Sequence, residues 1–289
     1  MLPHFVSIVL SVILVVGLLM VNAFYQSMMR LPSNTPSKYL RRISGKGKQR
    51  QILVLLGDSI THGRIGVNYV DMIADRPEGR DFEIINAGIN SELAWNNLQR
   101  LDEVIQCDPD VVTVLIGTND ANATMSEEIK REYIRNMRLP KEPSSEWYMR
   151  SLSSIVEGLK VKTKAKIALL SIPTIGENTS DPAFMRSSDY SAIVKEVAEE
   201  TDTTYLPLHE RMTEYLHKTH GNAKYPYQKY KIGIIKGIIS RYLFRRTWDN
   251  IARDSGFILH VDYLHLNTAG ARMVADLISD FVKSSLLRI

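Results

Sequence analysis

Cysteine is almost absent from the sequence, which contains only Cys107. A single cysteine cannot form a disulfide within the chain, so there is no disulfide framework and the redox compartment cannot be read from bonding. No group of histidines, cysteines and carboxylates has the spacing of metal ligands, and we expect neither a metal ion nor another cofactor. The sequence also lacks the Gly-Lys-Ser/Thr ending of a phosphate-binding loop, which argues against a nucleotide-binding domain.

Neither sign of charge dominates the sequence, since the formal net charge of the 289-residue chain is only +4. Basic residues nevertheless cluster after the first apolar stretch and again between Lys224 and Arg253, in both cases beside apolar or aromatic residues. A nucleic-acid site needs no neighbouring runs of Ile and Leu, so this pairing favours an anionic membrane surface over nucleic acid. An ordinary solvated basic face is the alternative interpretation.

The longest apolar run extends from Phe5 to Tyr25 without a charged side chain, close to the ~20 residues that span a bilayer. It predicts a signal peptide or a membrane anchor, and we favour an uncleaved anchor because no positively charged region precedes it. The flank that follows is basic. By the positive-inside rule this flank predicts that the remainder of the chain is cytoplasmic, whereas a cleaved signal would place it outside.

Beyond residue 50, short apolar runs rich in β-branched residues alternate with segments of helical periodicity. Such runs are typical of strands covered on both faces. The expected strands are Ile52–Leu56, Phe82–Ile85, Val111–Ile116, Ile167–Ser171 and Thr203–Leu206, and the expected helices are Tyr69–Ala74, Glu92–Ile105, Trp147–Lys162, Tyr190–Glu200 and Thr268–Leu287. This alternation predicts a three-layer α/β/α sandwich of flavodoxin-like type, with a parallel sheet of about five strands.

We divide the chain into three parts. They are an N-terminal transmembrane anchor or signal segment at 1–30, a basic linker at 31–50, and a folded domain at 51–289 that carries an insertion at 221–258. Within the insertion, Tyr225 to Phe257 interleave apolar residues with Lys and Arg, which predicts a basic amphipathic helix. This helix serves either as a lid or membrane-docking surface, or as an ordinary helix packed on the domain.

Three polar motifs lie where the carboxyl ends of strands are expected to meet. The first strand runs into Gly-Asp-Ser-Ile-Thr-His-Gly, whose glycines allow a sharp turn that exposes Ser59 above the sheet. Asn119, a short amide donor, follows the third strand. Asp262 precedes His265 by three residues, so its carboxylate can hold one imidazole nitrogen while the other accepts a serine proton. The parts of an activated serine nucleophile are therefore present.

These motifs, in this order, resemble those of the SGNH or GDSL hydrolase superfamily from roughly Gln51 to the C-terminus. The superfamily has a Gly-Asp-Ser turn, a block with Asn and Gly after the second strand, a Gly-x-Asn-Asp block and an Asp-x-x-His block. The resemblance implies a GDSL-type esterase, lipase, lysophospholipase or thioesterase in which Ser59 is the nucleophile, His265 the general base and acid, and Asp262 its orienting partner. It also implies an oxyanion hole made by the Ser59 amide, the Asn119 side chain and an amide of the second block.

The second block departs from the superfamily pattern. It reads Asn-Ala-Gly-Ile-Asn-Ser from Asn86 to Ser91, so the usual oxyanion glycine falls on Ser91. Ser91 keeps its backbone N–H but adds a Cβ that limits how closely an acyl group can approach. Gly88 is the alternative donor. Since loss of one donor lowers turnover about 10²- to 10³-fold, the departure is compatible with a slow enzyme.

Two other histidines are rival candidates for the base. His62 lies too close to Ser59 in sequence to reach it comfortably, and no carboxylate has a helpful spacing from it. His260 precedes Asp262 by two residues and would lie on the same side of an extended segment. Asp58 is expected to hold the turn by accepting hydrogen bonds from backbone amides.

The sequence therefore predicts serine-dependent hydrolysis of a carboxylic ester or thioester through an acyl-enzyme. If the insertion recognises lipid, the substrate is a lipid or lysophospholipid-like ester. Two alternatives remain open, namely an acyltransferase or deacetylase that acts on a sugar, and a non-catalytic binding module tethered to the membrane. The expected partners are an ester substrate and a membrane, contacted by residues 5–25 and by 225–257, without nucleic acid.

Overall fold

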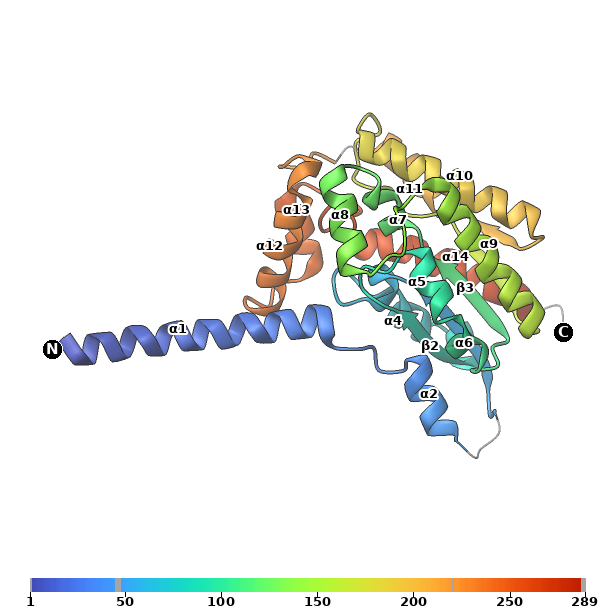
Figure 1. Ribbon diagram of the computed structural model, residues 1–289, viewed down its shortest axis with the longest axis horizontal. Coiled ribbons are helices and arrows are strands. Elements are labelled where there is room, and N and C mark those ends of the chain that lie inside the picture. Colours follow the sequence, from blue (N-terminus) through green and yellow to red (C-terminus); the bar gives the residue numbers. More distant parts are fainter. Residues whose placement is uncertain (1, 45–47, 220, 287–289) are drawn as a thin grey trace.

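A five-stranded parallel sheet forms the centre of the computed structural model, which describes residues 2–44, 48–219 and 221–286 (Figure 1). The strands are β1 (Gln51–Gly57), β2 (Phe82–Gly88), β3 (Val111–Leu115), β4 (Lys166–Leu170) and β5 (Thr204–Leu206). Their order in the sheet is β2-β1-β3-β4-β5, and each neighbouring pair is parallel. The predicted flavodoxin-like sheet is confirmed.

Helices cover both faces of the sheet, as strands buried on two sides require. Ile52, Val54 and Leu56 of β1 join one core, and Leu53 and Leu55 join the other, because successive side chains of a strand point to opposite faces. The first core packs on α5 (Ala94–Gln99), α6 (Leu101–Ile105), α9 (Ser145–Lys162) and α10 (Pro182–Glu200), and the second on α4 (Tyr69–Ala74), α11 (Leu208–Lys218) and α14 (Thr268–Leu286). The result is a three-layer α/β/α sandwich.

The strand order creates a switch point between β1 and β3, because the chain moves from β1 to β2 on one side and returns to β3 on the other. Gly57 is level with Gly88 of β2 and with Leu115 of β3, so these three strands end together. The loops that follow them meet above the switch point, where open α/β sheets bind their ligands.

The segment expected as one helix over 92–105 forms two helices instead. α5 ends and α6 begins at Arg100, whose φ is −114°. The Arg100 guanidinium donates to Glu92 at 2.7 Å and to the Ala87 carbonyl at the end of β2 at 2.6 Å. The periodicity also does not predict the short helices α7 (Thr118–Ala123) and η2 (Glu78–Asp81) or the charged helix α8 (Glu127–Asn136).

The apolar N-terminal segment is a helix, α1 (Leu2–Phe24), which extends away from the domain and continues as a π-helix, η1 (Tyr25–Met29) (Figure 1). Over Leu10–Met29, this part of the described chain is long and apolar enough to cross a membrane. The 23 residues of α1 extend about 34 Å at 1.5 Å per residue, compared with about 30 Å for a hydrocarbon core.

Within the range expected to be a linker, the structure has a helix, α2 (Pro36–Ile43). Thr35 caps it through its side-chain oxygen. Tyr39 is only 3% exposed, and the Asn34 carbonyl accepts a hydrogen bond from the Asn86 N–H of β2 at 2.9 Å. This segment therefore packs beside the edge strand of the sheet.

The insertion contains the predicted helix. Its elements are η3 (Tyr227–Lys229), α12 (Tyr230–Tyr242) and α13 (Trp248–Ser255). α12 contacts α1, and both α12 and α13 lie on the side of the domain from which α1 emerges (Figure 1).

Candidate active site

The turn after β1 places Ser59 at the carboxyl edge of the sheet. Glycine is required at position 57, because a Cβ there would lie 2.2 Å from Thr61 Oγ1. Asp58 accepts a hydrogen bond from the Ile60 N–H at 2.9 Å and so caps the short helix α3 (Ser59–His62). Asp58 thus holds the turn in the way expected from the sequence.

Ser59, His265 and Asp262 form a continuous hydrogen-bonded chain. Ser59 Oγ lies 3.0 Å from His265 Nε2, and His265 Nδ1 lies 2.9 Å from Asp262 Oδ2. Asp262 is itself fixed, since its Oδ1 accepts the N–H groups of Leu264 and His265 at 2.7 and 2.8 Å. With its proton on Nδ1, His265 presents the Nε2 lone pair to the serine hydroxyl, which is the arrangement that a general base requires.

Burial and charge shift the pKa values of Asp262 and His265 in opposite directions, and the effect of charge is the larger one. Burial raises the pKa of Asp262, but His265 and the two backbone amides hold that pKa below its ordinary value. Burial lowers the pKa of His265, but the Asp262 carboxylate outweighs it, so the pKa of His265 is raised. Asp262 therefore favours its ionised form, and its carboxylate favours the protonated form of the His265 imidazole.

Two backbone N–H groups at the site have no acceptor. Within the described ranges, neither Ser59 N–H nor Ser91 N–H donates to a protein atom, whereas Gly88 N–H donates to the Asn86 side chain at 2.9 Å. Gly88 is also packed against α3, since a Cβ on it would lie 2.2 Å from His62 N. Of the two donors considered for the second block, the geometry favours Ser91.

Ser91 adopts a φ of 65°, in the left-handed region that favours glycine. A side chain in this conformation costs about 1 kcal/mol. Ser91 lines the same cavity as Ser59. The backbone thus keeps the conformation of a glycine, while the side chain occupies space at the site.

Asn119 lies in the first turn of α7 with its amide held at both ends. Its Oδ1 accepts from Tyr133 OH at 2.7 Å, and its Nδ2 donates to the Glu92 carbonyl at 3.0 Å. Asp58 Oδ2 is 3.4 Å from the same nitrogen, which is long for a hydrogen bond. Nδ2 therefore has both hydrogens engaged, and a ligand in the cavity that Asn119 lines can receive the second one only by displacing this weak bond.

Tyr133 is a site residue that the sequence analysis missed. It belongs to α8, and its hydroxyl also accepts from Asn122 Nδ2 at 3.1 Å. Asn122 in turn bonds to Tyr227 and Tyr230 of the insertion. No pattern in the sequence connects a tyrosine of a charged helix with Asn119, because the contact arises only when α7, α8 and the insertion are folded together.

Neither of the two rival histidines belongs to the hydrogen-bonded chain of Ser59. His260 Nδ1 lies 3.1 Å from Glu177 Oε1, and its Nε2 lies 2.8 Å from the Thr174 carbonyl, so both ring nitrogens are engaged. His62 is buried, and burial lowers its pKa to about 4. Neither histidine lines the cavity that contains Ser59.

Two buried carboxyl groups brace the loops around the site. Asp58 caps α3, and Asp120 accepts the Ala94 N–H of α5 at 3.0 Å. Burial raises the pKa of each carboxyl to about 7. In the ranges that the structure describes, no group of three or more His, Cys, Asp or Glu is arranged to hold a metal ion.

The serine and histidine open into a cavity of about 370 Å³, within the range of small-ligand pockets. Its polar lining includes Ser59, Ser91, Asn119 and His265. Apolar walls surround these groups, formed by Met28, Ile60, Ile65, Met137, Ile234 and Leu264. The wall residue of η1 was not expected at the site from the sequence, whereas Ile234 belongs to the insertion helix that the sequence allowed as a lid.

Comparisons with known proteins bear on the family and the fold. An acetylxylan esterase of Geobacillus stearothermophilus is 28% identical over an alignment of 183 residues, which covers 57% of this chain and 78% of that protein. The crystal structure of the acetyl xylan esterase AlAXEase has a TM-score of 0.58 at 21% identity, covering 80% of this chain and 98% of that one. A structure of the Geobacillus acetylxylan esterase, described as a catalytic mutant with serine replaced by alanine, has a TM-score of 0.57 at 21% identity, covering 82% and 96%.

At these identities the solved structures establish the fold alone. The model of the GDSL-like lipase/acylhydrolase family matches residues 55–273, which contain every motif described above. The chain therefore belongs to the GDSL-like lipase/acylhydrolase family and is a hydrolase that acts on ester bonds.

Proposed function

We propose that this protein hydrolyses esters through a covalent acyl-enzyme on Ser59. The observation that carries the proposal is the relay from Ser59 Oγ to His265 Nε2 at 3.0 Å and from His265 Nδ1 to Asp262 at 2.9 Å. A serine hydroxyl is a weak nucleophile until a base removes its proton. An oriented imidazole within hydrogen-bonding distance provides that base.

The steps follow from the positions of these groups. Ser59 Oγ attacks the carbonyl carbon and passes its proton to His265 Nε2, while Asp262 stabilises the imidazolium. The Ser59 and Ser91 N–H groups and Asn119 Nδ2 donate to the oxyanion of the tetrahedral intermediate. His265 then protonates the departing alkoxide. Water repeats the sequence on the acyl-enzyme, so that the carboxylic acid leaves and Ser59 recovers its proton.

A second candidate function is removal of acetyl groups from a carbohydrate. The acetylxylan esterases among the similar proteins favour this substrate class. The apolar lining of the cavity by Met28, Ile65 and Ile234 favours a longer acyl chain instead. Because the same acyl-enzyme can be resolved by a sugar hydroxyl, acyl transfer shares the first half of this mechanism.

Labelling by a fluorophosphonate tests the nucleophile directly. The full-length chain in detergent micelles is expected to react, Ser59→Ala to lose all reaction, and the exposed control Ser180→Ala to react like the wild type. Nitrophenyl esters from acetyl upward, together with an acetylated xylo-oligosaccharide, then separate the two substrate classes. A folded wild-type protein that neither labels nor hydrolyses any of these esters would refute the enzyme and favour a binding module.

A further inference from the structure

Helix α12 packs one face on the domain, with Tyr230 and two glycines buried, and leaves two large isoleucines exposed on its other face. Gly233 and Gly237 are buried against the domain, whereas Ile232 and Ile235 are 50% and 55% exposed. The orientation is fixed, because a Cβ on Gly233 would lie 2.1 Å from the Tyr225 hydroxyl. The outward face of a surface helix in a globular protein is typically polar. The outer face of α12 therefore has the character of a surface that meets an apolar partner.

The exposed face continues beyond the helix and is positively charged. Phe244 is 70% exposed, and no Asp or Glu occurs from Tyr230 to Arg246. The basic residues in this stretch are Lys231, Lys236, Arg241, Arg245 and Arg246. Lys231 pairs with Glu132 and Arg246 with Asp254, while Lys236 and Arg245 have no ion-pair partner in the described ranges. Exposed isoleucine and phenylalanine beside unpaired cations are the composition of an interfacial helix.

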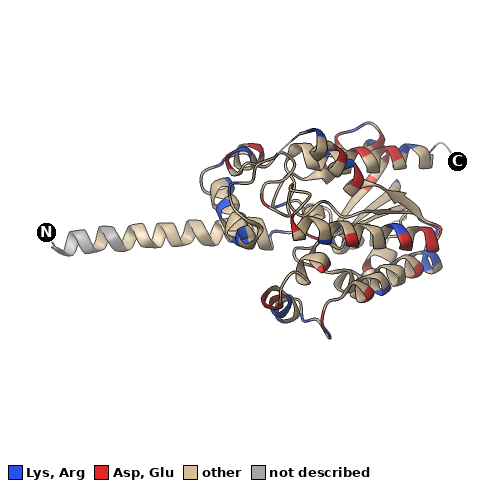
Figure 2. Ribbon diagram, turned by 90° about the horizontal axis from the view of Figure 1, so that it is seen from above, with Lys and Arg blue, Asp and Glu red and all other residues tan. Residues whose placement is uncertain are grey.

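This face lies beside the apolar helix α1. α12 contacts α1 and crosses its direction at the end next to the domain, and Figure 2 shows Lys and Arg gathered around that end. The exposed apolar surface of α1 includes Leu18, Leu19, Val21 and Phe24. If α1 crosses a bilayer, a helix that crosses its direction at this end lies along the bilayer surface.

The same elements form part of the wall around Ser59. Met28 of η1 and Ile234 of α12 line the cavity. Asn90, next to Ser91, donates to the Ser27 and Met28 carbonyls at 3.2 and 3.1 Å. The mouth of the cavity is therefore built on the side of the domain that carries α1 and α12.

We propose that the α12 surface, defined as the exposed residues from Ile232 to Arg245, docks on the anionic phospholipid surface of the bilayer that α1 enters. Its isoleucine and phenylalanine side chains enter the headgroup region, and its unpaired cations bind lipid phosphates. A second copy of the chain is a poorer partner, because a symmetric contact would oppose like charges. Docking brings the Ser59 cavity to the membrane. This docking, together with the proposed function on which the assignment rests, makes esters at the bilayer surface the substrate class.

Lipid contact can be measured on the full-length chain in nanodiscs. A fluorophore on a cysteine at Ile235→Cys reports contact with doxyl-labelled lipids, and the same label at Val161→Cys is the matched control. Val161 is 83% exposed and lies at the opposite end of the domain. We expect quenching at position 235 to exceed that at 161 by about two-fold or more in phosphatidylcholine with phosphatidylglycerol, and to fall in phosphatidylcholine alone.

Equal quenching at the two positions overturns the docking. Equal quenching at 235 in the two lipids overturns the charge contribution. A lipid-independent cross-link between two chains at position 235 identifies a second copy as the partner and also overturns the proposal.

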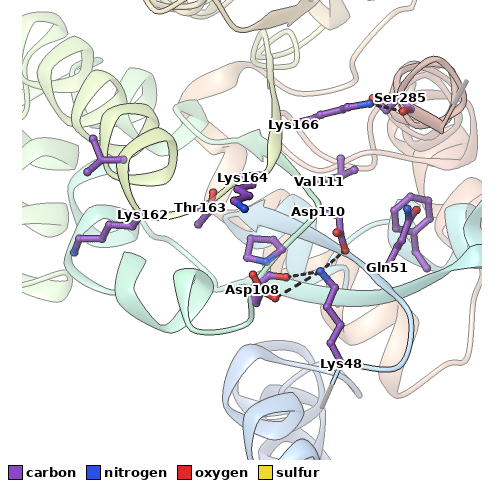
Figure 3. A pocket seen from close by; sticks show the side chains of 13 residues that line it. Lys48, Gln51, Asp108, Asp110, Val111, Lys162, Thr163, Lys164, Lys166 and Ser285 are labelled. Atoms are coloured by element: carbon purple, nitrogen blue, oxygen red, sulfur yellow. Dashed lines mark hydrogen bonds and ion pairs between the residues drawn. The ribbon is translucent and has the colours of Figure 1, made fainter. Parts of the chain in front are cut away.

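Charge reversal tests whether docking serves the reaction. Each basic residue near an anionic surface strengthens binding about five-fold, so K236E with R245E is expected to lower hydrolysis of a vesicle-borne ester by ten-fold or more. Hydrolysis of a soluble nitrophenyl ester should be unchanged, because neither residue lines the cavity. The matched control is K162E with K164E, on the surface drawn in Figure 3. Equal losses of vesicle-borne ester hydrolysis in the two double variants, or no loss in either, contradict the docking proposal. If the wild type fails to hydrolyse the soluble ester, the result contradicts the proposed function instead.

Discussion

The two ends of the sheet differ in chemistry more than in shape. At the amino end, the starts of β1, β3 and β4 surround a hollow (Figure 3). Its volume of about 630 Å³ exceeds that of the cavity beside Ser59, which is about 370 Å³. The charged groups of the hollow are exposed or half-exposed, and Lys48 forms ion pairs with Asp108 at 3.7 Å and with Asp110 at 2.7 Å. Exposed ion pairs of this kind contribute little to the stability of the fold.

At the carboxyl end, the charged groups are buried and form a hydrogen-bonded row that leads to Ser59. His265 is 4% exposed and Asp262 is 1% exposed, and each has its pKa moved by the other. The comparison teaches that the volume of a hollow does not identify an active site. What identifies it is a buried relay that ends on a nucleophile facing a cavity.

The largest expected effect comes from breaking the relay. His265→Ala should lower kcat about 10⁴- to 10⁶-fold, because Ser59 then has no base. Lys48→Ala, at the amino end, should leave kcat within about two-fold, since it removes only a surface ion pair. Initial rates on a soluble nitrophenyl ester give both values. A comparable loss in the two variants would mean that the two ends do not differ in function.

The oxyanion donors come next. Asn119→Ala should reduce kcat about 10²- to 10³-fold with little change in KM, since the donor acts in the transition state. Asn178→Ala, an exposed asparagine, is the control. Steady-state kinetics separates the two constants, and an effect on KM alone would assign Asn119 to substrate binding.

The pH profile should follow His265. The base is active when neutral, and because Asp262 raises its pKa, kcat/KM should fall about ten-fold per pH unit below a midpoint that lies above the ordinary 6.5. Circular dichroism over the same pH range controls for unfolding. A profile that is flat down to pH 5 would exclude His265 as the base.

Tyr133→Phe should have a smaller effect. It removes the hydrogen bond that orients Asn119 without removing the donor, and a hydrogen bond of about 1 kcal/mol corresponds to about five-fold in kcat. The double variant with Asn119→Ala distinguishes positioning from stability. If Tyr133 acts through Asn119, adding Tyr133→Phe to Asn119→Ala should cost almost nothing further, whereas additive losses would show an independent role.

Ser91→Gly should cause a small gain in both stability and activity. Removing a side chain from a left-handed residue stabilises the fold by about 0.5 to 1 kcal/mol and opens the approach of the acyl group. We expect a rise of a few degrees in the melting temperature together with a few-fold rise in kcat/KM. Lower activity in this variant would mean that the Ser91 hydroxyl itself contacts the substrate.

The sequence predicted the parts of the molecule that depend on local pattern. The strands are continuous apolar runs, and the sharp turn at Ser59 follows from its glycines, so the sheet and the order of the motifs could be placed before the structure. The three proposed catalytic residues lie within hydrogen-bonding distance as expected. Their roles remain predictions until the variants are measured.

Features set by contacts between distant segments could not be predicted. The break at Arg100 depends on the Ala87 carbonyl at the end of β2, and Tyr133 meets Asn119 only through the packing of α7 and α8. The helix within 31–50 was missed because its composition is that of a linker, and the burial of Tyr39 depends on the sheet beside it. Met28 at the cavity is another contact of this kind.

The hydrogen bonds from Asn90 to the carbonyls of Ser27 and Met28 join the apolar helix to the loop that carries Ser91. A protease that cut the chain just after Arg30 would release the domain and at the same time remove one wall of its cavity. Asn90 would then lose both acceptors, and the loop its tether. We therefore expect such a cut to change the selectivity of the enzyme, because the apolar N-terminal segment also contributes Met28 to the wall of the cavity.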